Sequence, residues 1–234
     1  MRTCHLIPLS GGPSGDWDSA LTEPESSQPK PRARIESLAD LIFGLALSVG
    51  AISLVSSPPT SVMGLYNDLG TFGFSFLILI TMWLRYTRIM SVFPLESRRV
   101  VNLNIMLLFC VSIEPFLFGL LKNASTGTSG AFADAVSTLY ALDMGAMFAI
   151  LGGFTLTLAD EERKLIPKGL IWQYRFEGVS CFTCGLIFGL SALPVFFRIT
   201  VMNGDPIRYY LWVIPLLLIW VTRNWRRYRG DFDE

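Results

Sequence analysis

Charged side chains are scarce in this sequence. They make up 16% of the 234 residues, whereas a soluble globular protein usually carries about 25%. Acidic and basic residues are equal in number, so the net charge is zero and gives no reason to expect nucleic acid as a partner. Because the few charges lie between long apolar runs, the chain is expected to have a lipid bilayer as its surroundings.

Histidine is almost missing, and the cysteines do not form the pattern of a disulfide framework. The only histidine is His5, near the start of the chain, so a histidine-based metal site or a Ser-His-Asp triad is excluded elsewhere. Cys181 and Cys184 have the spacing of a redox or metal site, but no second pair accompanies them, which favours simple packing. We therefore expect no catalytic residue, no metal and no cofactor, and predict that the protein is not an enzyme.

Residues 1–33 are rich in Ser, Gly and Pro and hold no long apolar run. Such a segment cannot bury enough apolar surface to offset the entropy lost on ordering, so we expect a disordered cytoplasmic tail. A membrane domain is expected over 34–223, with a second, short cytoplasmic tail over 224–234.

Six apolar runs predict an all-α fold. A helix crosses a bilayer with about 20 residues, and the shorter second and sixth runs end in aromatic and arginine side chains that can anchor at the headgroups. We therefore predict a polytopic membrane protein with six transmembrane helices. The runs are 39–55, 69–84, 100–121, 135–159, 179–197 and 209–222.

Lysine and arginine predict the orientation. If the chain starts inside, sixteen of these 19 residues fall on inner segments, and only Lys122, Arg198 and Arg208 fall on outer ones. Positive residues concentrate on the cytoplasmic side of membrane proteins. The prediction is a multi-pass protein of the cell membrane with both termini in the cytoplasm.

The first apolar run carries a stripe of branched side chains. Leu45, Val49 and Ile52 recur at i, i+4 and i+7, which places them on one side of a helix with Ser48 beside them. Any buried helix shows such a stripe, and a pore-lining helix would show it too. The sequence holds no Thr-Val-Gly-Tyr-Gly-like filter, so a potassium pore built on that loop is not indicated.

Glu114 and Asp143 are the acidic residues deepest in apolar sequence. A carboxyl group inside a membrane is costly and is therefore a candidate ion or proton site. For Asp143, a hydrogen-bonded packing role is an equal alternative. Glu114 directly precedes Pro115 near the expected outer end of its helix, which favours a structural role there.

The start of the membrane domain resembles a known family. Arg34, Leu38, Ala39 and Asp40 stand at the positions of the R-x-x-x-F-S-D signature that opens the first helix of the transmembrane protein 175 family, the endolysosomal potassium channels and their prokaryotic relatives. Leu38 and Ala39 depart from the family's Phe and Ser, and Arg85 begins the pair that replaces two family histidines, so the chain resembles a divergent member. The further similar positions are Phe43, Ser75, Phe76, Trp83, Leu103, Asn104, Pro115 and Phe116.

The resemblance implies a potassium-preferring cation channel with K⁺ as the permeant ion. Four copies of this six-helix chain would form a homotetramer around one pore lined by the first helices. Leu45, Val49 and Ile52 would form the constriction, and Ser48 would contact a partly dehydrated ion. The implied network that holds the first helix consists of Arg34, Leu38, Ala39, Asp40, Trp83 and Asn104, with Trp83 and Asn104 donating hydrogen bonds to a buried Asp40.

An alternative function is a proton- or cation-coupled secondary transporter, in which Glu114 and Asp143 would be the coupling groups. Many transporters consist of two repeats of inverted topology. No such repeat is visible between the two halves of this sequence, which weakens the alternative.

Overall fold

The described part of the chain is almost wholly helical. The computed structural model describes residues 31–56, 58–59, 61–93, 98–124, 130–160, 165–201 and 205–230, so segment 1–30 of the expected first tail lies outside it. The all-α expectation is confirmed for these residues, which contain one short antiparallel strand pair besides the helices. The elements are α1 (Pro31–Ser56), α2 (Val62–Val92), α3 (Arg98–Ala124), α4 (Gly130–Leu158), α5 (Lys168–Ser191), α6 (Pro194–Arg198), β1 (Thr200–Val201), β2 (Asp205–Pro206), α7 (Ile207–Leu211) and α8 (Val213–Gly230).

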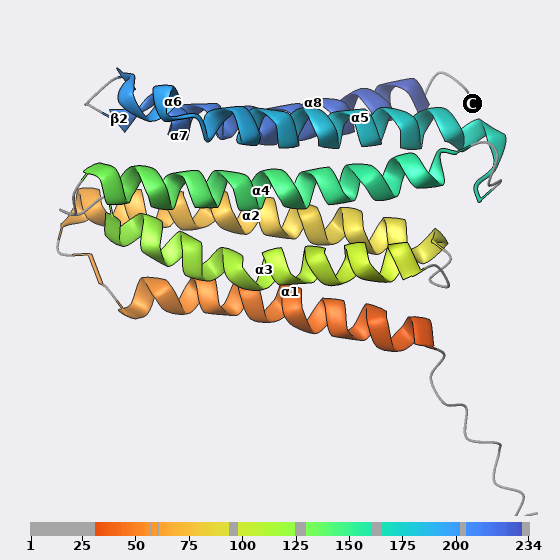
Figure 1. Ribbon diagram of the computed structural model, residues 1–234, viewed down its shortest axis with the longest axis horizontal. Coiled ribbons are helices and arrows are strands. Elements are labelled where there is room, and N and C mark those ends of the chain that lie inside the picture. Colours follow the sequence, from red (N-terminus) through yellow and green to blue (C-terminus); the bar gives the residue numbers. More distant parts are fainter. Residues whose placement is uncertain are drawn as a thin grey trace, which may run out of the picture.

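The long helices lie side by side with their axes roughly aligned (Figure 1). α1 lies at one edge of the bundle, α5 and α8 lie at the opposite edge, and α4 lies between them with α2 and α3 (Figure 1). α4 packs most extensively against α5 and also against α3, whereas α1 packs against α3 and α2. The first helix is therefore a peripheral element of the single chain.

Among the described residues, four helices are long and apolar enough to cross a membrane, namely α1 to α4. This identifies a multi-pass membrane protein, whereas the predicted six crossings remain a prediction. α5 is not among the four; it carries Arg175 and Glu177 in its first half. The apolar helical stretch at Ile207–Thr222 is shorter than a usual span.

Two predicted runs differ from the observed helices, and proline explains both differences. The run expected over 179–197 is divided because α5 ends at Ser191 and Pro194 starts α6. The run over 209–222 is divided at Trp212, between α7 and α8. Pro215 has no N–H to donate to the carbonyl of Leu211 four residues earlier, so an unbroken helix would leave that carbonyl without its usual partner.

The second predicted tail, 224–234, begins within α8. This helix continues to Gly230, beyond the end of its apolar part at Thr222. The boundary of the membrane domain at 223 stays a prediction.

Glycines bring α4 and α5 into close contact. A Cβ atom added to Gly185 would lie 3.0 Å from the Gly145 carbonyl oxygen, and one added to Gly145 would lie 3.2 Å from the Gly185 oxygen. Similarly, a Cβ atom on Gly152 would meet the Phe182 ring at 2.8 Å. Gly185 belongs to a G-x-x-x-G motif, whose other glycine, Gly189, would have open space around its Cβ. Only the first glycine of the motif is thus required for close helix approach within the chain.

This packing predicts that Gly185→Ala destabilises the protein by about 1–3 kcal/mol, because the added methyl group has to displace the α4 backbone. The matched control is Gly189→Ala, whose methyl group finds open space and favours the helix. Thermal unfolding of the detergent-solubilised protein measures both variants. Equal stability of the two would contradict the close contact.

Candidate pore site

α1 has one packed face and one exposed face. Ala39, Phe43 and Ala46 are at most 4% exposed and follow the i, i+4, i+7 pattern of one helix side. Gly50 continues this side, and a Cβ atom there would touch the Phe72 ring of α2 at 3.6 Å. Small residues therefore let α1 approach the other helices closely along this side.

The predicted stripe lies on the other face of α1. Leu45 is 65% exposed, Ile52 is 63% exposed and Val49 is 41% exposed. Leu41 and Val55 extend this face toward the two ends of the helix. A continuous branched apolar surface is thus left uncovered by the described part of the single chain, and it needs lipid or another protein surface against it.

Ser48 lies on the exposed face as well. Its hydroxyl donates a hydrogen bond to the carbonyl oxygen of Gly44 at 2.8 Å, one turn earlier in the helix. The hydroxyl therefore needs no partner on another helix, and Ser48 can be tolerated on an otherwise apolar surface.

Trp83 fastens the start of α1 to α2. Its indole Nε1–H donates to Asp40 Oδ1 at 2.9 Å, which is one of the two hydrogen bonds expected for this carboxylate. Asn104 is 3% exposed, and among the described residues no hydrogen bond from its amide N–H to Asp40 is found; its side chain interacts with Tyr86 instead. Asp40 is itself exposed, so the expectation of burial is wrong for the single chain, because α1 lies at the edge of the bundle.

The other signature positions are divided between the two sides of α1. Ala39 is fully buried, whereas Leu38, which stands at the position of the family's Phe, is 52% exposed. The backbone of Arg34 lies in the first turns of α1, but its side chain is outside the described residues.

Glu114 is buried among three helices. Ser75 Oγ of α2 donates to Glu114 Oε1 at 2.5 Å, and the Tyr140 hydroxyl of α4 donates to the same oxygen at 3.4 Å.

Asp143 of α4 is half-buried, and its side chain contacts Cys110 of α3. One of its carboxyl oxygens has no hydrogen-bond partner among the described residues. Within the described part of the chain, no cluster of three or more His, Cys, Asp or Glu could hold a metal ion.

Arg85 points into the bundle instead of anchoring at the headgroups. It is 6% exposed, lies 3.8 Å from Glu177 Oε1 of α5, and donates a hydrogen bond to the Cys181 thiol. The expectation of an interfacial anchor is thus corrected, because the carboxylate of α5 stabilises the charge inside the protein. Cys181 and Cys184 are both buried and form no disulfide with each other, in line with a packing role.

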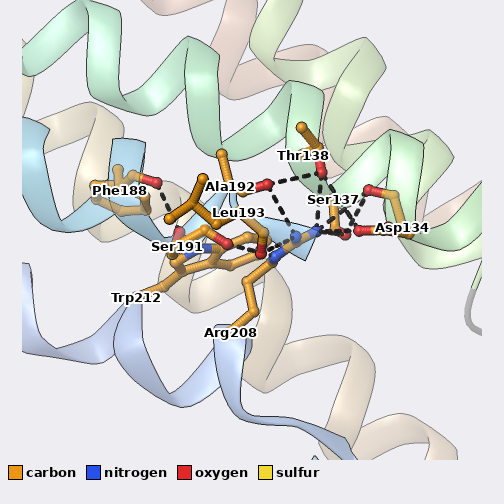
Figure 2. Close-up of polar contacts among 9 residues, drawn as sticks. All are labelled: Asp134, Ser137, Thr138, Phe188, Ser191, Ala192, Leu193, Arg208 and Trp212. Carbon is orange, nitrogen blue, oxygen red and sulfur yellow. Dashed lines mark hydrogen bonds and ion pairs between the residues drawn. The ribbon is translucent and has the colours of Figure 1, made fainter. Parts of the chain in front are cut away.

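Arg208 forms a polar cluster that the sequence did not reveal (Figure 2). Its side chain is fully buried, and its guanidinium donates to the last carbonyls of α5 and to the first turns of α4. Nε donates to Ser191 O at 2.7 Å, and the Asp134 carboxylate lies 2.9 Å from Nη1. The further acceptors are Ala192 O, Leu193 O, Asp134 O, Ser137 Oγ and Thr138 Oγ1. An arginine beside a short apolar run gives no signal of its partners in distant segments.

These features define a class of protein: a polytopic helical membrane protein whose first helix carries an uncovered apolar stripe. Residues 34–115 match the family described as endosomal/lysosomal potassium channel TMEM175. The match agrees with the resemblance seen in the sequence and extends from the signature to Pro115 in α3. The family is one of channels and not of enzymes.

A solved structure extends the likeness beyond the matched region. It is the crystal structure of a lysosomal potassium-selective channel TMEM175 homolog from Chamaesiphon Minutus, with a TM-score of 0.57 and 17% sequence identity. The similarity covers 82% of this chain and 97% of that one, so the two share a fold over nearly their whole helical part. No curated protein matches this chain in sequence.

The contact between Trp83 and Asp40 predicts an energetic coupling between α1 and α2. Trp83→Phe removes the N–H donor and keeps an aromatic ring, so it should destabilise the protein by about 1–2 kcal/mol. In a double-mutant cycle, Asp40→Ala should cost much less in the Trp83→Phe background than in the unaltered protein. Thermal unfolding gives the four stabilities, and strictly additive effects would show that the hydrogen bond contributes nothing.

Proposed function

We propose that this protein is a potassium-preferring cation channel whose pore is lined by α1 of each subunit. The observation that carries the proposal is the uncovered stripe of Leu45, Val49 and Ile52, which lies inside the region that matches the channel family. A helix at the edge of the bundle can reach a central axis without any rearrangement of the other helices (Figure 1).

A pore of this kind requires several copies of the chain, because one α1 cannot enclose a path for ions. We propose a homotetramer in which the stripes of four α1 helices face one another across the axis. Oligomerisation covers the apolar face that the single chain leaves exposed. Trp83 and Asp40 then hold the start of each pore helix against its own subunit.

The chemistry of the stripe suits a hydrophobic constriction. Water leaves a narrow ring of leucine side chains because hydrocarbon offers it no hydrogen bonds. An ion that crosses the ring then loses hydration that nothing replaces, so conduction stops when the ring is narrow. Leu45 is the most exposed of the three stripe residues and is proposed as the narrowest ring. Ser48 lies one turn after Leu45 on the same exposed face, and its hydroxyl oxygen is proposed to contact the ion next to the Leu45 ring.

The six-crossing topology belongs to the same proposal. α5 and the α7–α8 pair run along the other helices in the bundle, which is the arrangement expected of two further membrane crossings (Figure 1). With six crossings, both chain ends lie in the cytoplasm, as the lysine and arginine distribution predicts. The site of function is then the cell membrane.

The transporter alternative finds less support. Glu114 is engaged by the hydroxyls of Ser75 and Tyr140 and lies on the interfaces of α2, α3 and α4, where it fastens the bundle together. The α1 stripe contains no ionisable residue between Leu41 and Val55 that could serve as a coupling group.

The tetramer is tested by the native mass of the purified protein in detergent. Four chains per particle are expected, with each chain contributing 26.1 kDa. A stable monomer or dimer that resists reconstitution into larger particles would contradict a pore formed by four first helices.

The pore assignment is tested by Leu45→Asn, which adds a ring of amides to the constriction and should keep it hydrated. Single-channel current in bilayers should rise, and the preference for K⁺ over Na⁺ should fall. The matched control is Leu186→Asn in α5, since Leu186 is 61% exposed against 65% for Leu45 and lies at the opposite edge of the bundle. If both variants leave conductance and selectivity unchanged in assembled protein, α1 does not line the pore.

A further inference from the structure

The first turns of α5 have one exposed side that is basic and aromatic. Lys168, Trp172, Arg175 and Val179 recur at i, i+4, i+7 and i+11. Since each residue of a helix turns about 100°, the four lie within about 40° of one direction. All four are exposed, Trp172 at 63% and Val179 at 55%. One outward side of α5 therefore carries two positive groups and an indole, and becomes apolar at Val179.

The opposite side of α5 is packed against the rest of the bundle. Glu177, the only acidic residue of α5, belongs to this packed side and lies 3.8 Å from Arg85 of α2. Cys181, Cys184 and Phe188 continue the packed side and are all fully buried. The outward side of α5 thus presents positive charge without an acidic residue of the same helix beside it.

An apolar patch lies directly beyond Arg175, on the seam between α4 and α5. Leu156 of α4 packs over Gly178, where an added Cβ atom would lie 2.7 Å from Leu156 Cδ2. Leu156 is 37% exposed and Phe182 is 41% exposed, and Val179 lies in the same turn of α5 as Gly178. Leu156, Val179 and Phe182 therefore form an exposed hydrocarbon surface next to the basic turns.

The position of α5 in the bundle decides what this side meets. α5 lies at the edge opposite α1, and it begins at the end of the bundle where α1 also begins (Figure 1). If α1 lies at the axis of a tetramer, the edge that carries α5 faces the bilayer and not a neighbouring subunit. With the proposed orientation, the first turns of α5 lie at the cytoplasmic leaflet. Both steps rest on the proposed function.

We propose that the first turns of α5 bind the phosphate of an anionic phospholipid in the cytoplasmic leaflet, with an acyl chain against the patch of Leu156, Val179 and Phe182. Arg175 suits the phosphate, because its planar guanidinium can donate two parallel hydrogen bonds to it. A guanidinium has five N–H donors, so the phosphate can bind beside any contact that Arg175 makes within the chain. Lys168, about 10 Å further out along the helix axis, attracts the negative headgroup.

The arrangement favours a lipid over free phosphate. Trp172 lies between the two positive residues along the helix, and indole groups concentrate at the level of the headgroups. The hydrocarbon patch follows within one turn of Arg175, where an acyl chain attached to the bound phosphate would lie. Free phosphate would use the charges of Lys168 and Arg175 and leave the patch uncovered.

The test measures the lipid retained by the purified full-length protein. Native mass spectrometry follows exchange into mixed micelles with equal amounts of phosphatidylglycerol and phosphatidylcholine of the same acyl chains, which differ in headgroup charge. The unaltered protein should retain phosphatidylglycerol preferentially. Each positive charge removed from the site should weaken this preference about five-fold, so Lys168→Gln with Arg175→Gln should nearly abolish it.

Two controls separate the site from general effects of charge. Arg198→Gln removes an exposed positive charge beyond the other end of α5 and should leave the preference unchanged. Lys168→Arg with Arg175→Lys keeps both charges in place and should retain most of the preference. If the double glutamine variant does not assemble, Lys168→Gln alone, at the exposed start of α5, should still weaken the preference about five-fold.

Equal retention of the two lipids by the unaltered protein would overturn the proposal, and so would an unchanged preference in the glutamine variant. The same holds if Arg198→Gln loses as much of the preference as the glutamine variant, or if inorganic phosphate at equal concentration displaces phosphatidylglycerol. Lipid retention is measured without ion flow, so a conducting channel without lipid preference contradicts this proposal alone. A protein that retains phosphatidylglycerol and conducts no ions contradicts the channel proposal alone.

Discussion

The burial of the Arg208 charge is the constraint on which one end of the bundle depends. A fully buried guanidinium is tolerated only when its donors are hydrogen-bonded, and here they reach the end of α5 and the start of α4. The carbonyls at the end of a helix lack partners within the helix, and Arg208 supplies them for Ser191, Ala192 and Leu193. The interruption between α5 and α6 is therefore stabilised by a residue that comes 15 to 17 positions later in the chain. Trp212 completes the corner by donating to Ser191 Oγ at 2.9 Å.

The bundle combines a centre that is packed on all sides with an edge helix, α1, that is packed on one face only. α4 and α5 touch through backbone atoms at Gly145 and Gly185, and Arg208 fastens them at one end. α1 contacts the other helices through small residues and Phe43, whose ring lies 5.8 Å from that of Tyr86. A scaffold of this kind can hold α2, α3 and α4 fixed while one face of α1 remains uncovered.

Local properties of the sequence predicted the helices well, because hydropathy and proline act over a few residues. The six predicted runs correspond to α1 to α5 and to the α7–α8 pair, and the divisions within the last two runs occur beside Pro194 and Pro215. The sequence predicted that Leu45, Val49 and Ile52 share one side of a helix. It did not predict that this side is exposed in the single chain. Exposure depends on which helices pack against α1, and this is a property of the whole chain.

The polar contacts were predicted less well for the same reason. The resemblance predicted the contact of Trp83 with Asp40. The partner of Arg85 is Glu177, 92 residues away in sequence. The partner of Arg208 is Asp134, 74 residues away. Nothing in the local pattern distinguishes an arginine that enters a bundle from one that reaches the headgroups, because both kinds stand at the end of an apolar run. Only the positions of the carboxylates in three dimensions decide between them.

If four α1 helices line a pore as proposed, the hydrogen bond of Ser48 has a consequence for the sign of the ions that can pass. Because the hydroxyl hydrogen is directed to the Gly44 carbonyl, the oxygen presents lone pairs, and no donor, to the outside of the helix. A ring of such oxygens can replace part of the water around a cation, whereas an anion would find no hydrogen to replace the water that it gives up. A bond that belongs to the helix backbone can in this way favour positive over negative ions without any charged residue on that surface.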